Sequence, residues 1–257
     1  MVVFGDEPIV DRVWEAPADA SVIVQLPAGA KGEVYVTQDG SDPRGIGGGI
    51  SDTAHEVELG KPVNVAGVVL KTRTKNGEDW SALRELYFVR PIAGSALEIS
   101  EIQYHANGDK KEGRNVAAER FEFVEIRNPG KEAVALTGVA FTRGVYFQFA
   151  DGAIVEPGGH TVVAADPKAF KSRYGFKPTG KYIRSLSNNG ETVTLSDALG
   201  NEIDSVTFKD KAPWPSEADG SGRSLSRVDS ANGGDGNDPE NPLQDFLCPH
   251  IFTFCLA

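Results

Sequence analysis

The sequence contains little sulphur, since its only cysteines are Cys248 and Cys255, close to the C-terminal end, and methionine occurs once. The two thiols could form a small terminal disulfide or remain free. With no cysteine in the body of the chain, cysteine usage indicates no particular redox compartment. No hydrophobic run is long enough to span a bilayer. The N-terminus also lacks the basic region and apolar stretch of a signal peptide.

The chain also lacks a surplus of basic residues. Its 26 Lys and Arg residues face 37 Asp and Glu residues, which gives a net charge of −11. Binding to a nucleic acid backbone requires clustered positive charge that neutralises phosphates, so we do not expect a nucleic acid partner. An acidic surface instead favours cations and keeps a protein in solution.

What the sequence does contain is typical of a globular protein. Of its 257 residues, 40% are hydrophobic and 25% are charged, which excludes wholesale disorder. The length allows one large domain or two ordinary ones. The 29 glycines and the scattered prolines favour many short strands joined by turns.

Alternation of apolar and polar residues predicts an all-β fold, built as two tandem immunoglobulin-like β-sandwiches. A short Pro/Gly/Ser stretch at residues 91–96 separates two strand sets. We therefore expect domains at residues 1–93 and 94–245, followed by a hydrophobic tail at 246–257 of unknown role. Expected strands cover residues 21–26, 32–37, 55–59, 63–74, 83–89, 97–104, 121–127, 133–136, 145–149, 160–164, 191–195 and 203–208.

One short helix is expected within the second domain. Asp166 is a good N-cap, and the next residue is a proline, which suits the first helical position. Phe170 and Tyr174 lie four residues apart and so share one face. Gly175 can adopt the left-handed conformation that ends a helix.

The second half resembles the bacterial lamin tail domain, an immunoglobulin-like β-sandwich. Each matching motif is short, but their order and spacing over residues 96–245 are specific. The resemblance implies an accessory module of a large secreted or surface protein, with an extracellular or cell-surface location. The motifs occupy residues 98–104, 122–130, 134–138, 147–152, 157–164, 166–175, 186–195, 212–215 and 219–227.

The first half resembles the small β-sandwich module found at the C-terminus of chitobiases. Two strings carry this resemblance, residues 33–43 and 71–81, and the sharper is Asp-Gly-Ser-Asp-Pro at 39–43. Both families are accessory modules rather than catalytic domains. The pairing implies a fragment of a larger secreted bacterial protein whose partner is a polysaccharide or cell-surface glycan.

Two carboxylates could form a site. Glu101 and Glu125 would face each other if their strands pair, and they could then hold a cation such as calcium or share a proton. The alternative is that each makes separate contacts at a strand edge or turn. Glu98 and Glu122 each precede one of them by three residues, an offset that places strand side chains on opposite faces.

Two loops carry possible calcium ligands. Asp39 and Asp42 have suitable spacing but lack the distal acid of a calcium loop, and Asx turns explain them as well. Asp235, Asn237 and Asp238 lie in a segment denser in oxygen donors, which makes it the better metal candidate.

Two further groups of residues could bind a ligand. A basic run is interleaved with aromatics and could contact a phosphate backbone or an acidic glycan. The alternative is that Phe170 and Tyr174 pack the helix and leave the lysines solvated. The run consists of Lys168, Lys171, Arg173, Lys177, Lys181 and Arg184, and its aromatics are Phe170, Tyr174, Phe176 and Tyr182. Trp80 and Trp214 could stack on sugars, as could Trp14. For Trp214, between two prolines, the alternative is a plug at the end of the sandwich.

No catalytic constellation is evident, because the four histidines are far apart in sequence and no nucleophile motif occurs. We therefore expect a non-catalytic binding or adhesion module pair associated with carbohydrate. Two alternatives remain open. One is a metal-dependent, polysaccharide-active enzyme with a carboxylate site, and the other is a purely structural spacer.

Overall fold

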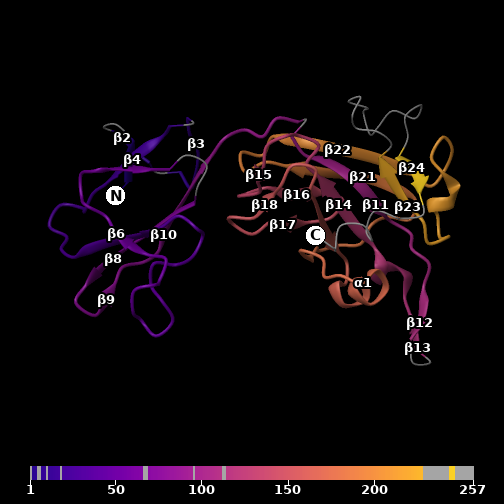
Figure 1. Cartoon of the computed structure of the whole chain (residues 1–257), viewed down its shortest axis with the longest axis horizontal. Coiled ribbons are helices and arrows are strands. Elements are labelled where there is room, and N and C mark those ends of the chain that lie inside the picture. Colours follow the sequence, from indigo (N-terminus) through magenta and orange to yellow (C-terminus); the bar gives the residue numbers. More distant parts are fainter. Residues whose placement is uncertain are drawn as a thin grey trace. The chain divides into compact units, whose positions relative to one another are not determined.

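The computed structural model describes residues 2–4, 7–9, 11–17, 19–65, 69–94, 96–111, 114–227 and 243–246. These residues form β-strands in several sheets and one α-helix, so the predicted all-β class is confirmed (Figure 1). The chain separates into two compact units. Unit 1 contains Met1–Pro91 with Ala135–Gly138 and Phe149–Ala153, and unit 2 contains Ile92–Val134, Val139–Gln148 and Ile154–Ala257.

Unit 1 contains two sheets. The four-stranded sheet has the order β2 (Glu7–Pro8), β1 (Val2–Phe4), β4 (Ser21–Val24), β7 (Pro62–Asn64). The second has the order β3 (Val13–Glu15), β10 (Arg84–Val89), β8 (Val69–Asn76), β5 (Glu33–Thr37), β6 (His55–Glu56), and β9 (Asp79–Trp80) pairs with β8. Of these pairings, β3 with β10 is parallel and the others are antiparallel.

Alternating apolar residues of both sheets form the core of unit 1. Val22 and Val24 of β4, Val34 and Val36 of β5, and Phe88 of β10 are all at most 4% exposed and belong to one cluster. This is the outcome that a period of two predicts, because every second side chain of a strand points to the same face. The stretch at 63–74, expected as one strand, is instead divided between β7 and β8 in different sheets.

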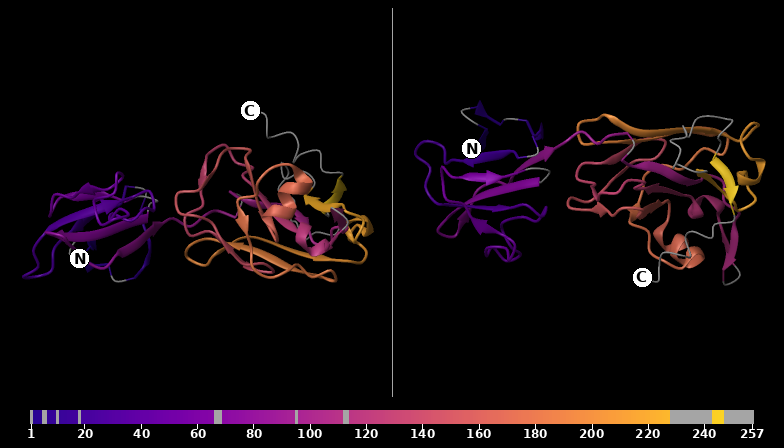
Figure 2. Two further views of the ribbon diagram at one scale, coloured as in Figure 1. Left: turned by 90° about the horizontal axis from the view of Figure 1, so that it is seen from below. Right: turned by 45° about the horizontal axis from the view of Figure 1, so that its top comes forward.

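Unit 2 also contains two main sheets (Figure 2). The six-stranded one has the order β20 (Gly180–Lys181), β19 (His160–Ala164), β14 (Phe123–Arg127), β11 (Glu98–Gln103), β23 (Ser224–Arg227), β24 (Leu243–Phe246). The four-stranded one has the order β17 (Phe147–Gln148), β16 (Ala140–Arg143), β21 (Gly190–Ser196), β22 (Glu202–Lys209). Smaller elements are the hairpin β12 (Asp109–Lys111) with β13 (Arg114–Val116), the pair β15 (Val134–Ala135) with β18 (Ile154–Val155), and the 3-10 turns η1 (Ala118–Phe121) and η2 (Ser216–Ala218).

The expected helix is present as α1 (Pro167–Tyr174). The Asp166 carboxylate accepts hydrogen bonds from the backbone N–H groups of Lys168 and Ala169 at 2.9 and 3.0 Å. Gly175 ends the helix in the left-handed conformation, with φ of 88°. Phe170 is fully buried against β14 and β19. Both caps and the packing face are therefore as predicted from the sequence.

Several expectations fall on residues that the structure does not describe. They are the metal candidates Asp235, Asn237 and Asp238, both cysteines, and all of the C-terminal tail except Phe246. Among the residues that are described, no helix is both long and apolar enough to cross a membrane.

Candidate functional site

Glu101 and Glu125 are brought together by strand pairing. Strands β11 and β14 are antiparallel, and the two glutamates are direct register partners. The register shifts between Ile99 and Glu101, so one extra residue, Ser100, forms a β-bulge. Both glutamates are buried, at 4% and 7% exposed. The strand pairing on which the expected approach of these two glutamates depends is thus present.

The bulge corrects one expectation about this region. Glu98 pairs with Arg127 and Glu101 pairs with Glu125, and these partners are two residues apart on β14. Alternate residues of a strand share a face, so Glu98 and Glu101 lie on the same face despite their offset of three. The offset rule fails here because the extra residue at position 100 restores the alternation.

Each carboxylate of the pair has its own hydrogen-bond partners. Glu125 Oε1 accepts from Ser100 Oγ at 2.8 Å and lies 2.8 Å from His160 Nδ1. Glu101 accepts from Ser224 Oγ on β23. In the described part of the chain, no group of three or more His, Cys, Asp or Glu side chains is arranged to hold a metal ion. Calcium at Glu101 and Glu125 stays a prediction.

The neighbouring acidic residues, Glu98 and Glu122, interact with other side chains and with the backbone of unit 2. Glu98 lies 2.7 Å from Arg127 and 3.7 Å from Arg227, and Arg227 also contacts Asp204 at 2.8 Å. Through Arg227 of β23, these ion pairs connect the two main sheets of unit 2. Glu122 is 2% exposed, and burial raises its pKa to about 7 although the backbone N–H of Leu186 and the hydroxyl of Tyr182 donate to it.

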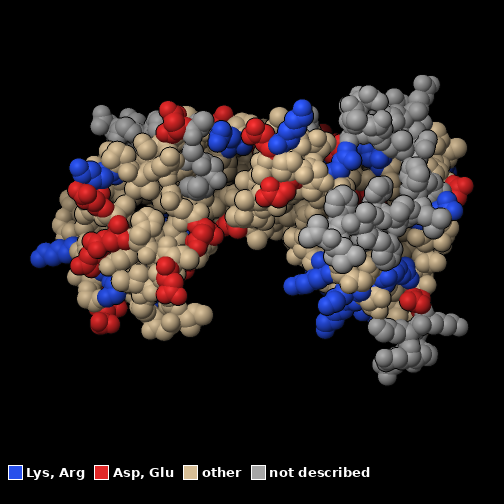
Figure 3. All heavy atoms as spheres, in the orientation of Figure 1, with Lys and Arg blue, Asp and Glu red and all other residues tan. Residues whose placement is uncertain are grey.

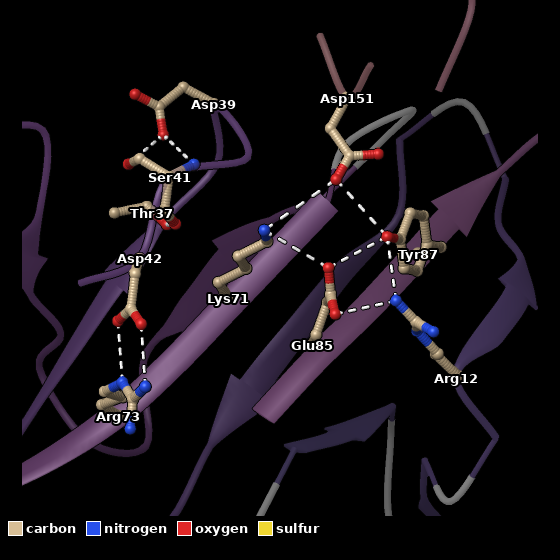
Figure 4. Close-up of polar contacts among 10 residues, drawn as sticks. All are labelled: Arg12, Thr37, Asp39, Ser41, Asp42, Lys71, Arg73, Glu85, Tyr87 and Asp151. Atoms are coloured by element: carbon tan, nitrogen blue, oxygen red, sulfur yellow. Dashed lines mark hydrogen bonds and ion pairs between the residues drawn. The ribbon is translucent and has the colours of Figure 1, made fainter. Parts of the chain in front are cut away.

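In unit 1, Asp39 and Asp42 close a turn (Figure 4). Asp39 Oδ1 accepts from the backbone N–H of Ser41 at 3.0 Å and from its hydroxyl at 2.6 Å. Asp42 forms a two-point ion pair with Arg73, at 2.7 and 2.8 Å. The hydrogen bonds from Ser41 and from Arg73 lower the pKa of Asp39 and Asp42 respectively. This geometry favours an Asx turn over a calcium loop at these two residues.

Trp80 lies beside a glycine-rich loop in unit 1. Its indole N–H donates to the carbonyl of Gly48 at 2.8 Å, and Tyr35 lies 5.8 Å away, centroid to centroid. The loop is closed by a bridge between Arg44 and Ile50. Ile50 is 44% exposed, and Ile46 at the loop tip is fully exposed. Trp80 itself is partly buried.

The other two tryptophans pack into their units. Trp214 is 7% exposed, which favours the role of a plug over that of a sugar platform. Trp14 packs edge-on against Phe88 at 5.7 Å and contacts the unit 1 core. Of the three indoles, that of Trp80 is therefore the one best placed to meet a ligand.

The basic run of unit 2 surrounds α1, where Lys and Arg side chains gather (Figure 3). Lys171 is exposed, whereas Tyr174 is half-buried with its ring 5.3 Å from that of Phe123. Phe176 packs on Phe170 at 5.1 Å, and Tyr182 is buried. The structure therefore exposes the cations of this run to solvent, except Arg173, which packs over the ring of Phe121, and it turns the aromatics inward.

A pocket that the sequence reasoning missed lies along the four-stranded sheet of unit 2. Its lining includes Arg143, Arg184 and Lys209, which are far apart in the sequence. Only Arg184 was noticed, as the last residue of the basic run. The signal that could have revealed the pocket is the pair of turn glycines, Gly144 and Gly190, each beside one of its strands.

Comparison with known proteins supports the assignment of the second half. Residues 90–210 match the family described as Lamin Tail Domain. A crystal structure of a DUF4876 family protein from Bacteroides thetaiotaomicron aligns with a TM-score of 0.33 and 11% identity, over 78% of this chain and 77% of that one. No functionally curated protein matches the sequence. The stretch at 90–210 is accordingly a lamin-tail-like, immunoglobulin-like β-sandwich.

Proposed function

We propose that this chain is a non-catalytic binding or adhesion module pair of a larger secreted bacterial protein, with carbohydrate as its ligand. The lamin-tail-like sandwich of unit 2 supports the assignment as an accessory module. For unit 1, the resemblance to the chitobiase C-terminal module supports the same class. The observation that carries the carbohydrate proposal is the position of Trp80.

Trp80 has the properties of a sugar-stacking side chain. Its N–H bond to Gly48 fixes the orientation of the ring, so little rotamer entropy is lost when a ligand binds. Tyr35 supports it from the same sheet, and Lys75 Nζ lies 6.0 Å from the indole centroid. A pyranose presents an apolar C–H face that packs on an aromatic ring, while its hydroxyls remain available for hydrogen bonds.

The loop at residues 44–50 extends this surface. Ile46 and Ile50 are two of the exposed large hydrophobic residues of unit 1, and both belong to the loop that Trp80 anchors. Exposed apolar groups that gather beside an aromatic ring are typical of a binding surface. We assign the glycan-contacting surface of unit 1 to Trp80 and this loop.

The test is a pull-down of the full chain with insoluble cellulose, chitin and xylan, followed by affinity measurement on the polysaccharide that binds. We expect Trp80→Ala to weaken binding at least fivefold, because loss of the apolar contact area of the indole costs about 1–3 kcal/mol. Trp80→Phe should retain part of the affinity. Melting temperatures of both variants establish that the fold is intact.

A variant outside this surface provides the control. Lys171→Gln in unit 2 should bind these neutral polysaccharides as the wild type does. The proposal fails if the wild type binds none of the polysaccharides, or if folded Trp80→Ala binds with unchanged affinity.

A further inference from the structure

Beyond that function, we propose that unit 2 carries a second and separate site, a cationic pocket that binds the anionic group of an acidic sugar. The pocket has a volume of about 390 Å³. This is within the lower range of small-ligand sites. Its cations are Arg143 at the end of β16, Lys209 at the end of β22, and Arg184 in the segment that precedes β21.

The three cations leave the pocket with net positive charge. Within the described part of the chain, neither Arg143, Arg184 nor Lys209 forms an ion pair. The one acidic lining residue is Glu191, and its Oε1 already accepts a hydrogen bond from the backbone N–H of Ser187. Cations that converge without carboxylate partners attract an anion, and an arginine fork can bind carboxylate or sulfate through two hydrogen bonds.

The backbone of Arg184 adopts an unfavourable conformation. Its φ is 75°, and it is the one non-glycine residue with positive φ among those the structure describes. Residue 183 before it is fixed by two backbone hydrogen bonds with Tyr146, at 3.0 and 2.9 Å. Such strained residues are unfavourable and gather at functional sites, where the surrounding structure enforces them.

The two turn glycines allow the strands that line the pocket to approach closely. A Cβ on Gly190 would lie 2.3 Å from the carbonyl oxygen of Phe208, and one on Gly144 would lie 2.8 Å from that of Thr192. Both glycines also have positive φ, of 95° and 79°. Only glycine satisfies both conditions without a shift of the backbone. The close approach of the strands that line the pocket therefore depends on glycine at both positions.

An apolar surface adjoins the cations and indicates a sugar rather than a simple ion. Tyr146 is 44% exposed, and the guanidinium of Arg184 lies 5.7 Å from its ring centroid. Ile183, next to Arg184, is 72% exposed. An inorganic anion needs no such surface. A pyranose that carries a carboxylate or sulfate would stack on Tyr146 and direct its charge to the arginines.

Nucleic acid fits this surface less well. The chain has a net charge of −11, which opposes the long-range attraction of a phosphate backbone. The aromatics of the neighbouring basic run pack inward, so they offer no row of platforms for successive bases. A local pocket for one charged sugar requires neither feature.

The experiment is calorimetric titration of the full chain with oligogalacturonate as the carboxylate probe and heparin-derived oligosaccharide as the sulfate probe. Cellohexaose, sodium sulfate and single-stranded DNA serve as comparison ligands. We expect one acidic oligosaccharide to bind at least tenfold more tightly than cellohexaose or DNA. The stronger of the two acidic probes identifies the anionic group.

Variants locate the site. Arg184→Asn keeps a residue that tolerates positive φ, and together with Lys209→Gln it should weaken acidic-sugar binding at least tenfold. Tyr146→Ala should weaken sugar binding, and Tyr146→Phe should restore it. Lys131→Gln removes a positive charge from an exposed side chain of unit 2 that lies outside the pocket and the basic run, and it should change affinity less than twofold. Trp80→Ala should have no effect, which separates this site from that of unit 1.

The proposal is overturned if neither acidic oligosaccharide binds, if DNA binds more tightly than both, or if sodium sulfate alone accounts for the affinity. Equal losses for Lys131→Gln and Arg184→Asn would also overturn it, because they would show a general charge effect. Melting temperatures identify any variant that fails to fold. In that case Arg143→Gln, on an exposed side chain of β16, replaces it.

Discussion

Glu101 and Glu125 are direct register partners on β11 and β14, but their carboxylates accept hydrogen bonds from two different serine hydroxyls. Ser224 of β23 donates to Glu101, and Ser100 of the bulge donates to Glu125. Two facing carboxylates disfavour each other's ionisation unless hydrogen bonds or a cation offset the repulsion. In this structure the serine hydroxyls supply hydrogen bonds to both.

The first prediction concerns the serine that holds Glu101. Ser224 is 3% exposed, so Ser224→Ala leaves a buried acceptor without this donor. We expect a loss of roughly 1–3 kcal/mol in the free energy of unfolding, measured by urea titration. Ser226→Ala, on the same strand, is the matched control and should change little, although Ser226 and not Ser224 is the register partner of Glu101. Equal effects of the two changes would contradict the role given to Ser224.

Calcium at the same pair can be tested in the same samples. A ligand that binds only the folded state raises the melting temperature. If the pair binds calcium, millimolar calcium raises the melting temperature of the wild type, EDTA reverses the shift, and Glu101→Gln abolishes it. An unchanged melting temperature in calcium would contradict this prediction from the sequence.

The strands that the sequence predicted are present because their core residues alternate, but many short strands, such as β1, β3 and β9, were not predicted. The sequence missed β23, whose residues 224–227 include a single large apolar side chain, Leu225. It also missed β16, a short strand whose register with β21 is irregular at residue 142. The run at 63–74 crosses from one sheet to the other, and alternation alone does not indicate which sheet a residue joins.

The candidate sites were less predictable than the fold. The facing of Glu101 and Glu125 followed from strand pairing, but the bulge at Ser100 could not be read from the residue pattern. The pocket between Arg143, Arg184 and Lys209 depends on which strands are neighbours, and local sequence does not contain that information. By contrast, the helix caps are local, which is why the sequence predicted them correctly.

The second prediction concerns the N-cap of α1. Asp166 accepts two backbone hydrogen bonds and also pairs with Arg120 at 2.7 Å. We expect Asp166→Ala to lower the free energy of unfolding by about 1–2 kcal/mol, measured by chemical denaturation. Asp166→Ser should recover part of the loss because a serine hydroxyl can also cap a helix. If Asp166→Ser is as unstable as Asp166→Ala, the ion pair and not the cap is the main contribution.

The third prediction concerns the ion pair between Asp42 and Arg73. Because the guanidinium donates through two nitrogens, lysine cannot reproduce the contact, and we expect Arg73→Lys to lower the stability by about 1 kcal/mol. The pKa of Asp42 is lowered in the folded state, so the pair stabilises the fold above the unfolded pKa of an aspartate and loses its effect as the pH falls through the lowered value. The difference between wild type and Arg73→Lys should therefore shrink in acid. A difference that is constant with pH would contradict this account.

The fourth prediction concerns the buried carboxyl of Glu122. Its pKa is about 7 in the folded state against 4.5 for an ordinary glutamate, and burial is the main cause. Between these values the unfolded state binds fewer protons than the folded state, so the free energy of unfolding falls as the pH rises from about 4.5 to about 7. Relative to Glu122→Gln, which stays neutral, the wild type should lose on the order of 3 kcal/mol at most over this range.

Urea titrations at several pH values between about 4 and about 8 measure this slope. Glu119→Gln is the matched control, because Glu119 is exposed and its negative charge only adds to the shift of Glu122. It should leave most of the slope in place, whereas Glu122→Gln should remove it. If both variants keep the wild-type slope, Glu122 is ionised in the folded protein at neutral pH, and its two donors, the hydroxyl of Tyr182 and the N–H of Leu186, outweigh the cost of burial.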